Sequence, residues 1–323
     1  MTRSTITFRS GDIDCSAWHY VGSSGRFTTQ AGRPCVVMAH GLAGTKDSGL
    51  DAFAQAFAKA GLDVLAFDYR GFGESGGARR QTVSMAWQLE DYRQAMSAAG
   101  RLEGVDAQRL VLWGVSLSGG HVFAAGAGRH DVAAVIAVTP LVDGLAAGLH
   151  ALASHTPAQL LRSTGRSVLG RLAELTGRSE VMIPVVGRPG DVAALTTPGA
   201  LEGYLAMAGP SWRNEIAASV LLGLGNHRPG RYAAQLRSPV LVQIADLDQS
   251  APPHAAAKAA FKARAEVRRY PCDHFDIYQG HAWHEKAVAH QLLFLNRHLV
   301  NSDSAVPQAP ASANGDRAGH VQL

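Results

Sequence analysis

The chain has 323 residues, of which 46% are apolar and 17% charged, so it can bury a large core and is too apolar to be largely disordered. Its formal net charge of +4 comes from scattered lysines and arginines, which argues against the clustered basic surface of a nucleic-acid-binding protein. Its three cysteines, Cys15, Cys35 and Cys272, fit neither a disulfide framework nor a zinc site. We therefore expect no nucleic-acid partner, no metal and no cofactor.

The N-terminal residues lack the apolar stretch of a signal peptide. No apolar run approaches the roughly 18 residues that a membrane span needs. These features predict a cytoplasmic protein without a membrane partner.

Strand-like and helix-like segments alternate along the chain. Short apolar runs that end at glycine or polar residues predict buried strands, at 35–40, 64–67, 110–113, 132–138, 239–244 and 266–270. Apolar residues at helical spacing predict helices at 51–60, 83–98 and 252–263, another that starts at 117, and a last one with its apolar stripe at 288–299. This alternation is typical of parallel β-α-β units, so we predict an α/β fold with a mostly parallel central sheet flanked by helices.

One segment interrupts the alternation. Residues 141–232 hold mostly helix-like stretches, at 145–153, 158–176, 191–206 and 212–222. We predict that they form a helical cap over the carboxyl edge of the sheet, with residues 1–140 and 233–300 as the core. Residues 301–323 are rich in Ser, Ala, Pro and Gly without periodicity, which predicts a disordered tail.

A serine stands at a turn built from small residues. Strand 110–113 leads into Gly114-Val115-Ser116-Leu117-Ser118, and two more glycines follow. A strand–turn–helix of the form Gly-x-Ser-x-Gly exposes the serine hydroxyl at the carboxyl end of the strand. Ser118 replaces the last glycine of this pattern but is also small. Ser116 is therefore the candidate nucleophile, and an ordinary loop serine is the alternative.

A serine nucleophile needs a base, which in this type of turn follows an acid later in the chain. His274 comes after strand 266–270, and Asp246 and Asp248 come after strand 239–244. Because the carboxyl ends of parallel strands meet at one edge, we expect these side chains near Ser116. We predict His274 as the base and Asp248 as the acid that fixes its tautomer, with Asp246 as the second choice.

The negative charge that develops on a substrate carbonyl needs hydrogen-bond donors. Strand 35–40 continues into His40-Gly41-Leu42-Ala43-Gly44, whose small residues let backbone N–H groups turn inward. We predict that the N–H groups of Leu42 and Leu117 form an oxyanion hole. His40 precedes Ser116 in the chain and is predicted to shape this loop, not to act as a base.

Together these motifs resemble those of the α/β-hydrolase superfamily. The matching segments are residues 40–44, Asp68-Tyr-Arg-Gly-Phe-Gly-Glu-Ser-Gly at 68–76, the turn around Ser116, residues 245–248 and residues 270–275. The chain is most similar to bacterial serine hydrolases of the serine aminopeptidase and dienelactone hydrolase-like branches, in which the acid falls on Asp248. The resemblance implies the α/β-hydrolase fold and a triad, but it does not specify the substrate. The departures are Ser118 and Ala245, where many relatives carry glycine.

The motifs and the resemblance predict a serine hydrolase that cleaves a carboxylic ester through an acyl-enzyme. Tyr204 and Trp212, in the apolar cap, are the candidate substrate-binding residues, because the cap is expected to roof the pocket. A small ester-like molecule is the expected partner, and a homodimer formed through the cap is left open. The alternatives are the same triad acting on an amide, thioester, lactone or carbon–carbon bond, a catalytically silent receptor, or a scaffold protein.

Two further groups are weighed and set aside. His281, His284 and His290 resemble a metal cluster at helical spacing, but they are more typical of a helix surface. Cys272 lies two residues before the candidate base, and we expect it to be a buried, inert thiol.

Overall fold

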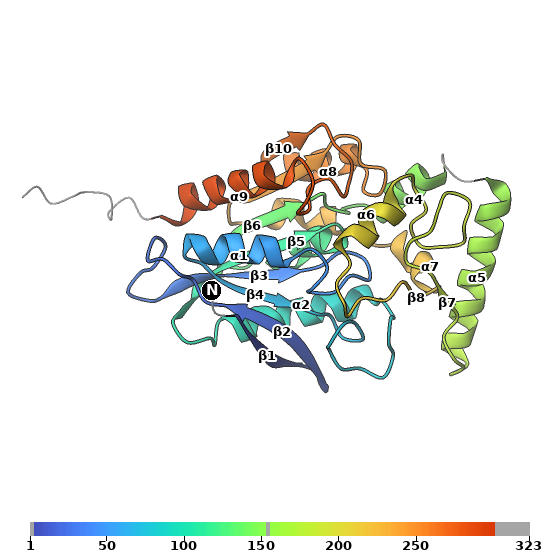
Figure 1. The fold of residues 1–323 in the computed structure, drawn as a ribbon, viewed down its shortest axis with the longest axis horizontal. Coiled ribbons are helices and arrows are strands. Elements are labelled where there is room, and N and C mark those ends of the chain that lie inside the picture. Colours follow the sequence, from blue (N-terminus) through green and yellow to red (C-terminus); the bar gives the residue numbers. More distant parts are fainter. Residues whose placement is uncertain (1–2, 153–155, 301–323) are drawn as a thin grey trace, which may run out of the picture.

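A computed structural model describes residues 3–152 and 156–300, whose strands form two sheets. The strands are β1 (Arg3–Ser10), β2 (Ile13–Tyr20), β3 (Arg33–Ala39), β4 (Asp63–Phe67), β5 (Val105–Val115), β6 (Val132–Val138), β7 (Met182–Ile183), β8 (Ile216–Ala217), β9 (Val240–Ala245) and β10 (Glu266–Tyr270). The larger sheet has the order β1-β2-β4-β3-β5-β6-β9-β10 (Figure 1). β2 pairs antiparallel with both β1 and β4, and all other neighbours in this sheet are parallel. The predicted α/β fold with a mostly parallel sheet is thus confirmed.

Helices cover both faces of this sheet. They are α1 (Asp51–Ala60), α2 (Met85–Ala99), α3 (Leu117–Gly126), α4 (Gly144–Leu152), α5 (Pro157–Leu175), α6 (Ala200–Met207), α7 (Val220–Leu224), α8 (Pro253–Lys262), α9 (His284–Leu299) and the 3-10 helix η1 (Pro229–Gln235). α1 packs against α9, whereas α2 packs against α3, and both α3 and α8 pack against η1. The chain moves from β3 to β4 in one direction along the sheet and from β5 onward in the other. Right-handed connections therefore place α1 and α2 on opposite faces.

The core lies between the sheet and these helix layers. Every residue of β4 and β9 is buried, which explains why their sequences are almost uninterruptedly apolar. α1 has the predicted bounds and ends at Gly61, whose φ of 109° is a left-handed conformation that favours glycine. The strands β1 and β2 were not predicted; five of the eight residues in β1 are exposed, and Ile6 and Phe8 are its only apolar residues, so it has no apolar run.

Part of residues 141–232 differs from prediction. α4 and α5 are close to the predicted helices, but the helix expected at 191–206 is present only as α6. Its first half forms a loop instead, because Leu195 donates its N–H to Val185 and Gly199 takes a left-handed φ of 78° just before α6 begins.

The prediction of a helix at 212–222 is also wrong for most of its length. Ile216 and Ala217 form β8, which pairs antiparallel with β7, and only Val220–Leu224 is helical. Ala217 also donates its N–H to the Gln81 carbonyl of the core at 2.9 Å, so tertiary pairing overrides local helix preference here.

The division into a core, a cap and a tail stays a prediction, and the tail at 301–323 lies outside the described residues. The elements from α4 to α7 lie beyond one end of the sheet (Figure 1), whereas η1 packs against α3 and α8. Within residues 3–152 and 156–300, no helix combines the length and the apolar character that crossing a membrane requires.

Candidate active site

Ser116 occupies a strained turn between β5 and α3. Its φ of 57° lies in the left-handed region, which a residue with a side chain rarely adopts. Its N–H donates to the Val138 carbonyl at the end of β6, at 2.9 Å. A Cβ at Gly114 would lie 2.2 Å from the Ser118 carbonyl oxygen, so glycine is required at that position. The turn thus has the strained backbone of the predicted nucleophile turn.

Ser116 lies at the point where the order of the strands along the sheet reverses direction. The connections that follow β3 and β5, two neighbouring strands, run opposite ways along the sheet. Such a switch point is where ligands bind in α/β folds. The loop after β3 reaches Ser116, since a Cβ built on Gly41 would lie 3.1 Å from the Ser116 Cβ.

The structure brings His274 together with Asp248. The His274 ring nitrogen Nδ1 lies 2.7 Å from Oδ2 of Asp248, and both residues are 3% exposed. The other carboxylate oxygen of Asp248, Oδ1, accepts the N–H groups of Ser250 at 2.8 Å and Ala251 at 2.6 Å. These three contacts fix the orientation of the carboxylate.

Ser116 and His274 follow β5 and β10, which end at the same edge of the sheet. Among the described residues no hydrogen bond joins Ser116 Oγ to the His274 ring. In structures without substrate such bonds are often long and tighten only when substrate binds.

Asp246, the second choice for the acid, points elsewhere. It forms an ion pair with Arg269 at 2.6 Å, and its side chain is 34% exposed. The three histidines of the helix-spaced group also have partners: Nδ1 of His281 lies 3.5 Å from Asp276, Nδ1 of His284 lies 3.0 Å from the Ile277 carbonyl, and Nδ1 of His290 lies 2.9 Å from the Tyr270 hydroxyl.

Opposing effects set the pKa of His274. Burial lowers it, but the charge of Asp248 and the hydrogen bond to it act against burial, and the net pKa is raised above 6.5. Burial also raises the pKa of Cys272 to about 12, so this buried, unpaired thiol is protonated at neutral pH.

Two backbone N–H groups are available near Ser116. In the described part of the chain, neither Leu42 N–H nor Leu117 N–H donates to a protein acceptor, although both residues are buried. Unpaired buried N–H groups are rare in proteins and need an explanation. An acceptor that arrives with a ligand is such an explanation.

A buried lysine, Lys46, anchors the loop that carries Leu42 to residues 68–76. Lys46 is 1% exposed, and its Nζ lies 2.6 Å from Asp68 and 2.6 Å from Glu74. The Lys46 N–H also donates to Asp68 at 2.6 Å. Residues 68–76, which belonged to the predicted motif, therefore position this loop.

Ser118 ties the same loop to α3. Its hydroxyl is fully buried, donates to the His40 carbonyl and lies 2.7 Å from the Tyr69 hydroxyl. Nδ1 of His40 donates to the Gly41 carbonyl at 2.9 Å, and burial lowers the pKa of His40. These contacts suit a loop-shaping His40.

Tyr204 of α6 reaches the same loop from the other side. Its hydroxyl donates to the Leu42 carbonyl at 2.5 Å, and its ring stacks on Trp212 with centroids 5.0 Å apart. Its edge contacts Phe275, which in turn contacts the His274 ring. A row of aromatic rings therefore runs from Trp212 to the candidate base.

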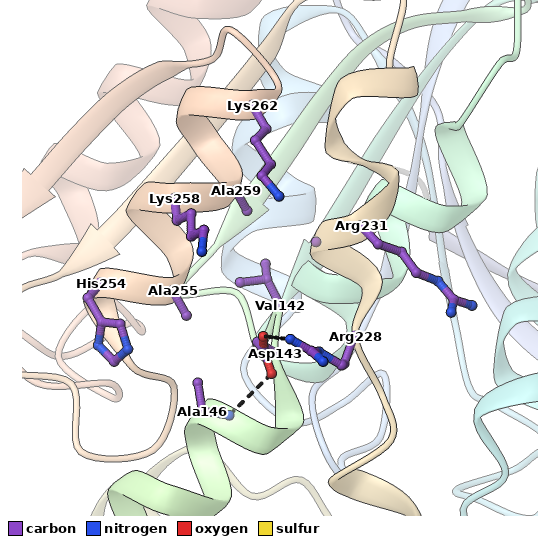
Figure 2. A pocket seen from close by; sticks show the side chains of 11 residues that line it. Val142, Asp143, Ala146, Arg228, Arg231, His254, Ala255, Lys258, Ala259 and Lys262 are labelled. Atoms are coloured by element: carbon purple, nitrogen blue, oxygen red, sulfur yellow. Dashed lines mark hydrogen bonds and ion pairs between the residues drawn. The ribbon is translucent and has the colours of Figure 1, made fainter.

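A cavity of about 470 Å³ lies elsewhere, between η1 and α8 beside the start of α4 (Figure 2). Its charged lining residues are Asp143, Arg228, Arg231, Lys258 and Lys262, with His254. Asp143 is paired with Arg228 at 3.1 Å and accepts the N–H groups of Leu145 and Ala146 in the first turn of α4. None of the predicted catalytic residues lines this cavity, so we do not assign the reaction to it.

Several contributors to the site carried no signal in the sequence. The N–H groups of Ser250 and Ala251 depend on backbone geometry alone. The buried hydroxyls of Tyr69 and Ser118 look like ordinary polar residues until the fold places them together.

Comparisons with known proteins agree with this architecture. Residues 34–281 match the family model described as the alpha/beta hydrolase fold. A quorum-quenching protein, AidA from Acinetobacter baumannii (strain MDR-ZJ06), is 36% identical over 295 residues, 90% of this chain and 94% of the relative. A monoacylglycerol lipase from Mycolicibacterium smegmatis is 34% identical over 228 residues, 68% of this chain and 72% of the relative.

A solved structure shows the same fold. The alpha/beta hydrolase GrgF from Penicillium sp. sh18 superposes with a TM-score of 0.75, covering 93% of this chain and 100% of that one at 22% identity. The comparisons as a whole support an enzyme of the hydrolase or acyltransferase type.

Proposed function

The chain belongs to the α/β-hydrolase family, and we propose that it is a serine hydrolase that cleaves a carboxylic ester through an acyl-enzyme. The single observation that carries the proposal is the buried contact between His274 and Asp248, held by two backbone donors, at the sheet edge that also carries the strained Ser116. The assignment to the serine aminopeptidase and dienelactone hydrolase-like branches is part of this proposal.

In the first step His274 Nε2 removes the hydroxyl proton of Ser116 as Oγ bonds to the ester carbonyl carbon. The carbonyl π electrons move to oxygen, and the N–H groups of Leu42 and Leu117 donate to the resulting oxyanion. The intermediate collapses, the bond to the alkoxy group breaks, and His274 returns the proton to the departing alcohol. Water then repeats the sequence on the acyl-enzyme and releases the acid.

Asp248 supports both steps without exchanging a proton. Its Oδ2 accepts a hydrogen bond from the N–H at Nδ1 of His274, so Nε2 is left free to act as the base. The raised pKa of His274, to which Asp248 contributes against the effect of burial, supports stabilisation of the charged imidazolium that forms in each step.

Of the two candidate substrate-binding residues, we propose that Trp212 contacts the substrate and that Tyr204 positions the loop beside it. The Tyr204 hydroxyl is already bonded to the loop that carries the Leu42 N–H, so this residue positions the loop. Trp212, half-buried at the end of the row of rings, is the residue proposed to contact the acyl or alcohol part of a small, largely apolar ester.

A panel of p-nitrophenyl esters with a fluorophosphonate label tests the proposal. Ser116→Ala should lower kcat by about 10³-fold or more and abolish labelling, with an unchanged circular dichroism spectrum. Ser118→Ala is the matched control, and it should keep the label because its hydroxyl is fully buried. A wild-type protein that is neither labelled nor active on esters would favour the receptor alternative. Labelling of Ser118 would assign the role of nucleophile to Ser118 in place of Ser116.

The panel also separates the remaining chemistries. Amide, thioester and lactone substrates presented to the same variants report which acyl bond the triad cleaves. A thioester or lactone with a larger kcat/KM than every ester would correct the substrate class but not the triad.

A further inference from the structure

α5 packs onto the rest of the molecule with its polar and small side chains. Its buried residues are Gln159, Ser167, Gly170 and Ala173. Its large apolar residues other than Leu160 face solvent, with these exposed fractions: Leu161 76%, Val168 43%, Leu169 57%, Leu172 53% and Leu175 67%. A surface helix of a monomeric protein shows the reverse arrangement, because the apolar stripe faces the core.

The exposed residues form a regular seam. Ala158, Leu161, Gly165, Val168, Leu172 and Leu175 succeed one another at steps of three and four residues along the whole helix. This is the heptad spacing with which one helix packs against another helix. Among the described residues nothing lies within 4 Å of a Cβ built on Gly165, so no contact in this part of the chain explains a glycine in mid-helix.

The seam is complementary to itself. In an antiparallel pair centred between Arg166 and Ser167, Leu161 lies level with Leu172 of the second copy. Gly165 lies level with Val168 of the second copy, and Ala158 with Leu175. Each small residue then faces a large one, which is the alternation that lets facing layers interdigitate.

The position of α5 leaves this face accessible. α5 is the outermost element of the segment between β6 and β9 and stands at the right-hand end of the molecule in Figure 1. On its inner side it packs against α7.

We propose that the seam of α5 is the contact surface of a two-fold homodimer in which α5 packs antiparallel against α5 of a second copy. The exposed fractions of the four large seam residues and of Leu169, which lies beside the seam, add up to about three side chains, or roughly 300 Å² per copy at about 100 Å² for each Leu or Val. Two copies bury about 600 Å² of apolar surface, and because about 60% of an interface is apolar, the total is about 1,000 Å². That area is at the lower limit for a specific interface, so the dimer should dissociate on dilution.

Sedimentation velocity over a concentration series tests the dimer. The wild-type protein should pass from monomer to dimer as its concentration rises. Leu161→Glu/Leu172→Glu should weaken the dimer by at least about 30-fold, the effect of losing one strong contact residue. Leu293→Glu is the matched control, because Leu293 is 57% exposed on α9. A monomeric wild type, or a dimer that survives the double substitution, overturns the proposal.

Crosslinking tests the orientation. Ala158→Cys/Leu175→Cys should form a covalent dimer with a short bismaleimide, whereas Leu175→Cys alone should not. Two copies of residue 175 lie about 25 Å apart in the antiparallel pair, at about 1.5 Å of rise per residue. The three native cysteines are buried and serve as an internal blank. Crosslinking of Leu175→Cys alone contradicts the antiparallel arrangement.

A vesicle arm separates a second copy from a lipid surface. The wild-type protein is floated with vesicles of phosphatidylglycerol and phosphatidylcholine. Flotation of a protein that sediments as a monomer, lost in Leu161→Glu/Leu172→Glu, would assign the seam to lipid and overturn the dimer.

Discussion

Replacing Asp248 by asparagine tests the arrangement at His274 most directly. Oδ1 of Asp248 accepts two backbone N–H groups, and Oδ2 faces Nδ1 of His274. An asparagine has only one acceptor oxygen, which should remain with the two N–H donors. Its NH₂ group then faces Nδ1, which must accept a hydrogen bond, so the imidazole proton moves to Nε2. A ring protonated at Nε2 cannot take the proton of Ser116.

The size of the expected loss in kcat/KM follows from the N–H groups of Ser250 and Ala251. The productive tautomer requires a flipped amide, which leaves the N–H groups of Ser250 and Ala251 without an acceptor. Each unsatisfied buried donor costs about 1–3 kcal/mol, or about 2–6 kcal/mol for the pair. At about 1.4 kcal/mol per tenfold change, Asp248→Asn should lower kcat/KM by between about 30-fold and 10⁴-fold.

The assay is kcat/KM for a p-nitrophenyl ester, with the melting temperature as a check on folding. Asp246→Asn is the control, because it removes a charge from the same turn but only breaks the exposed pair with Arg269. We expect a change of no more than about twofold, as for most surface ion pairs. A loss below tenfold for Asp248→Asn, or a greater loss for Asp246→Asn, would refute the reasoning.

Three further predictions concern pH, the loop and stability. Because the neutral imidazole is the reactive form and the pKa of His274 is raised, kcat/KM should increase with pH through a midpoint above 6.5; a midpoint below 6.5 contradicts the assigned base. Tyr204→Phe loses the hydrogen bond to the Leu42 carbonyl, so kcat should fall by about 2- to 13-fold with KM little changed, and an equal loss in Tyr278→Phe, at a buried tyrosine whose ring stacks on Phe275, would point to packing instead. Lys46→Met leaves the buried Asp68 without its cation, which should lower the free energy of unfolding in urea by about 3–5 kcal/mol; a change below about 1 kcal/mol would show that Asp68 finds another partner.

The core could be predicted because local pattern and tertiary environment agree there. Strands β3, β4, β6 and β9 are buried almost throughout, so their apolar runs are visible in the sequence. The order of serine, acid and histidine places all three after strands that end at one edge. This much of the site needs only the fold class and the chain order.

The secondary structure of residues 141–232 was harder to predict, because apolar residues are buried in its loops as well as in its helices. Val186 and Leu195 form a bridge between loop segments, although Leu195 lies in the stretch 191–206 that was predicted to be helical. The apolar stripe of α5 is visible from its spacing, but spacing does not tell whether a stripe faces inward or outward. Which carboxylate meets His274 depends on the turn after β9, whose backbone donors have no residue-type signature.

The buried contact between Ser118 and Tyr69 links two positions that are 49 residues apart in the chain. Changing Ser118 to glycine restores the common form of the motif but leaves the Tyr69 hydroxyl without this partner in a fully buried site. Changing Tyr69 to phenylalanine at the same time removes that cost. Positions 69 and 118 should therefore show correlated substitutions among homologous sequences, with serine at 118 paired with tyrosine at 69 and glycine at 118 paired with phenylalanine at 69. An alignment of the lineage of this chain should hold few sequences with the mixed combination of glycine and tyrosine.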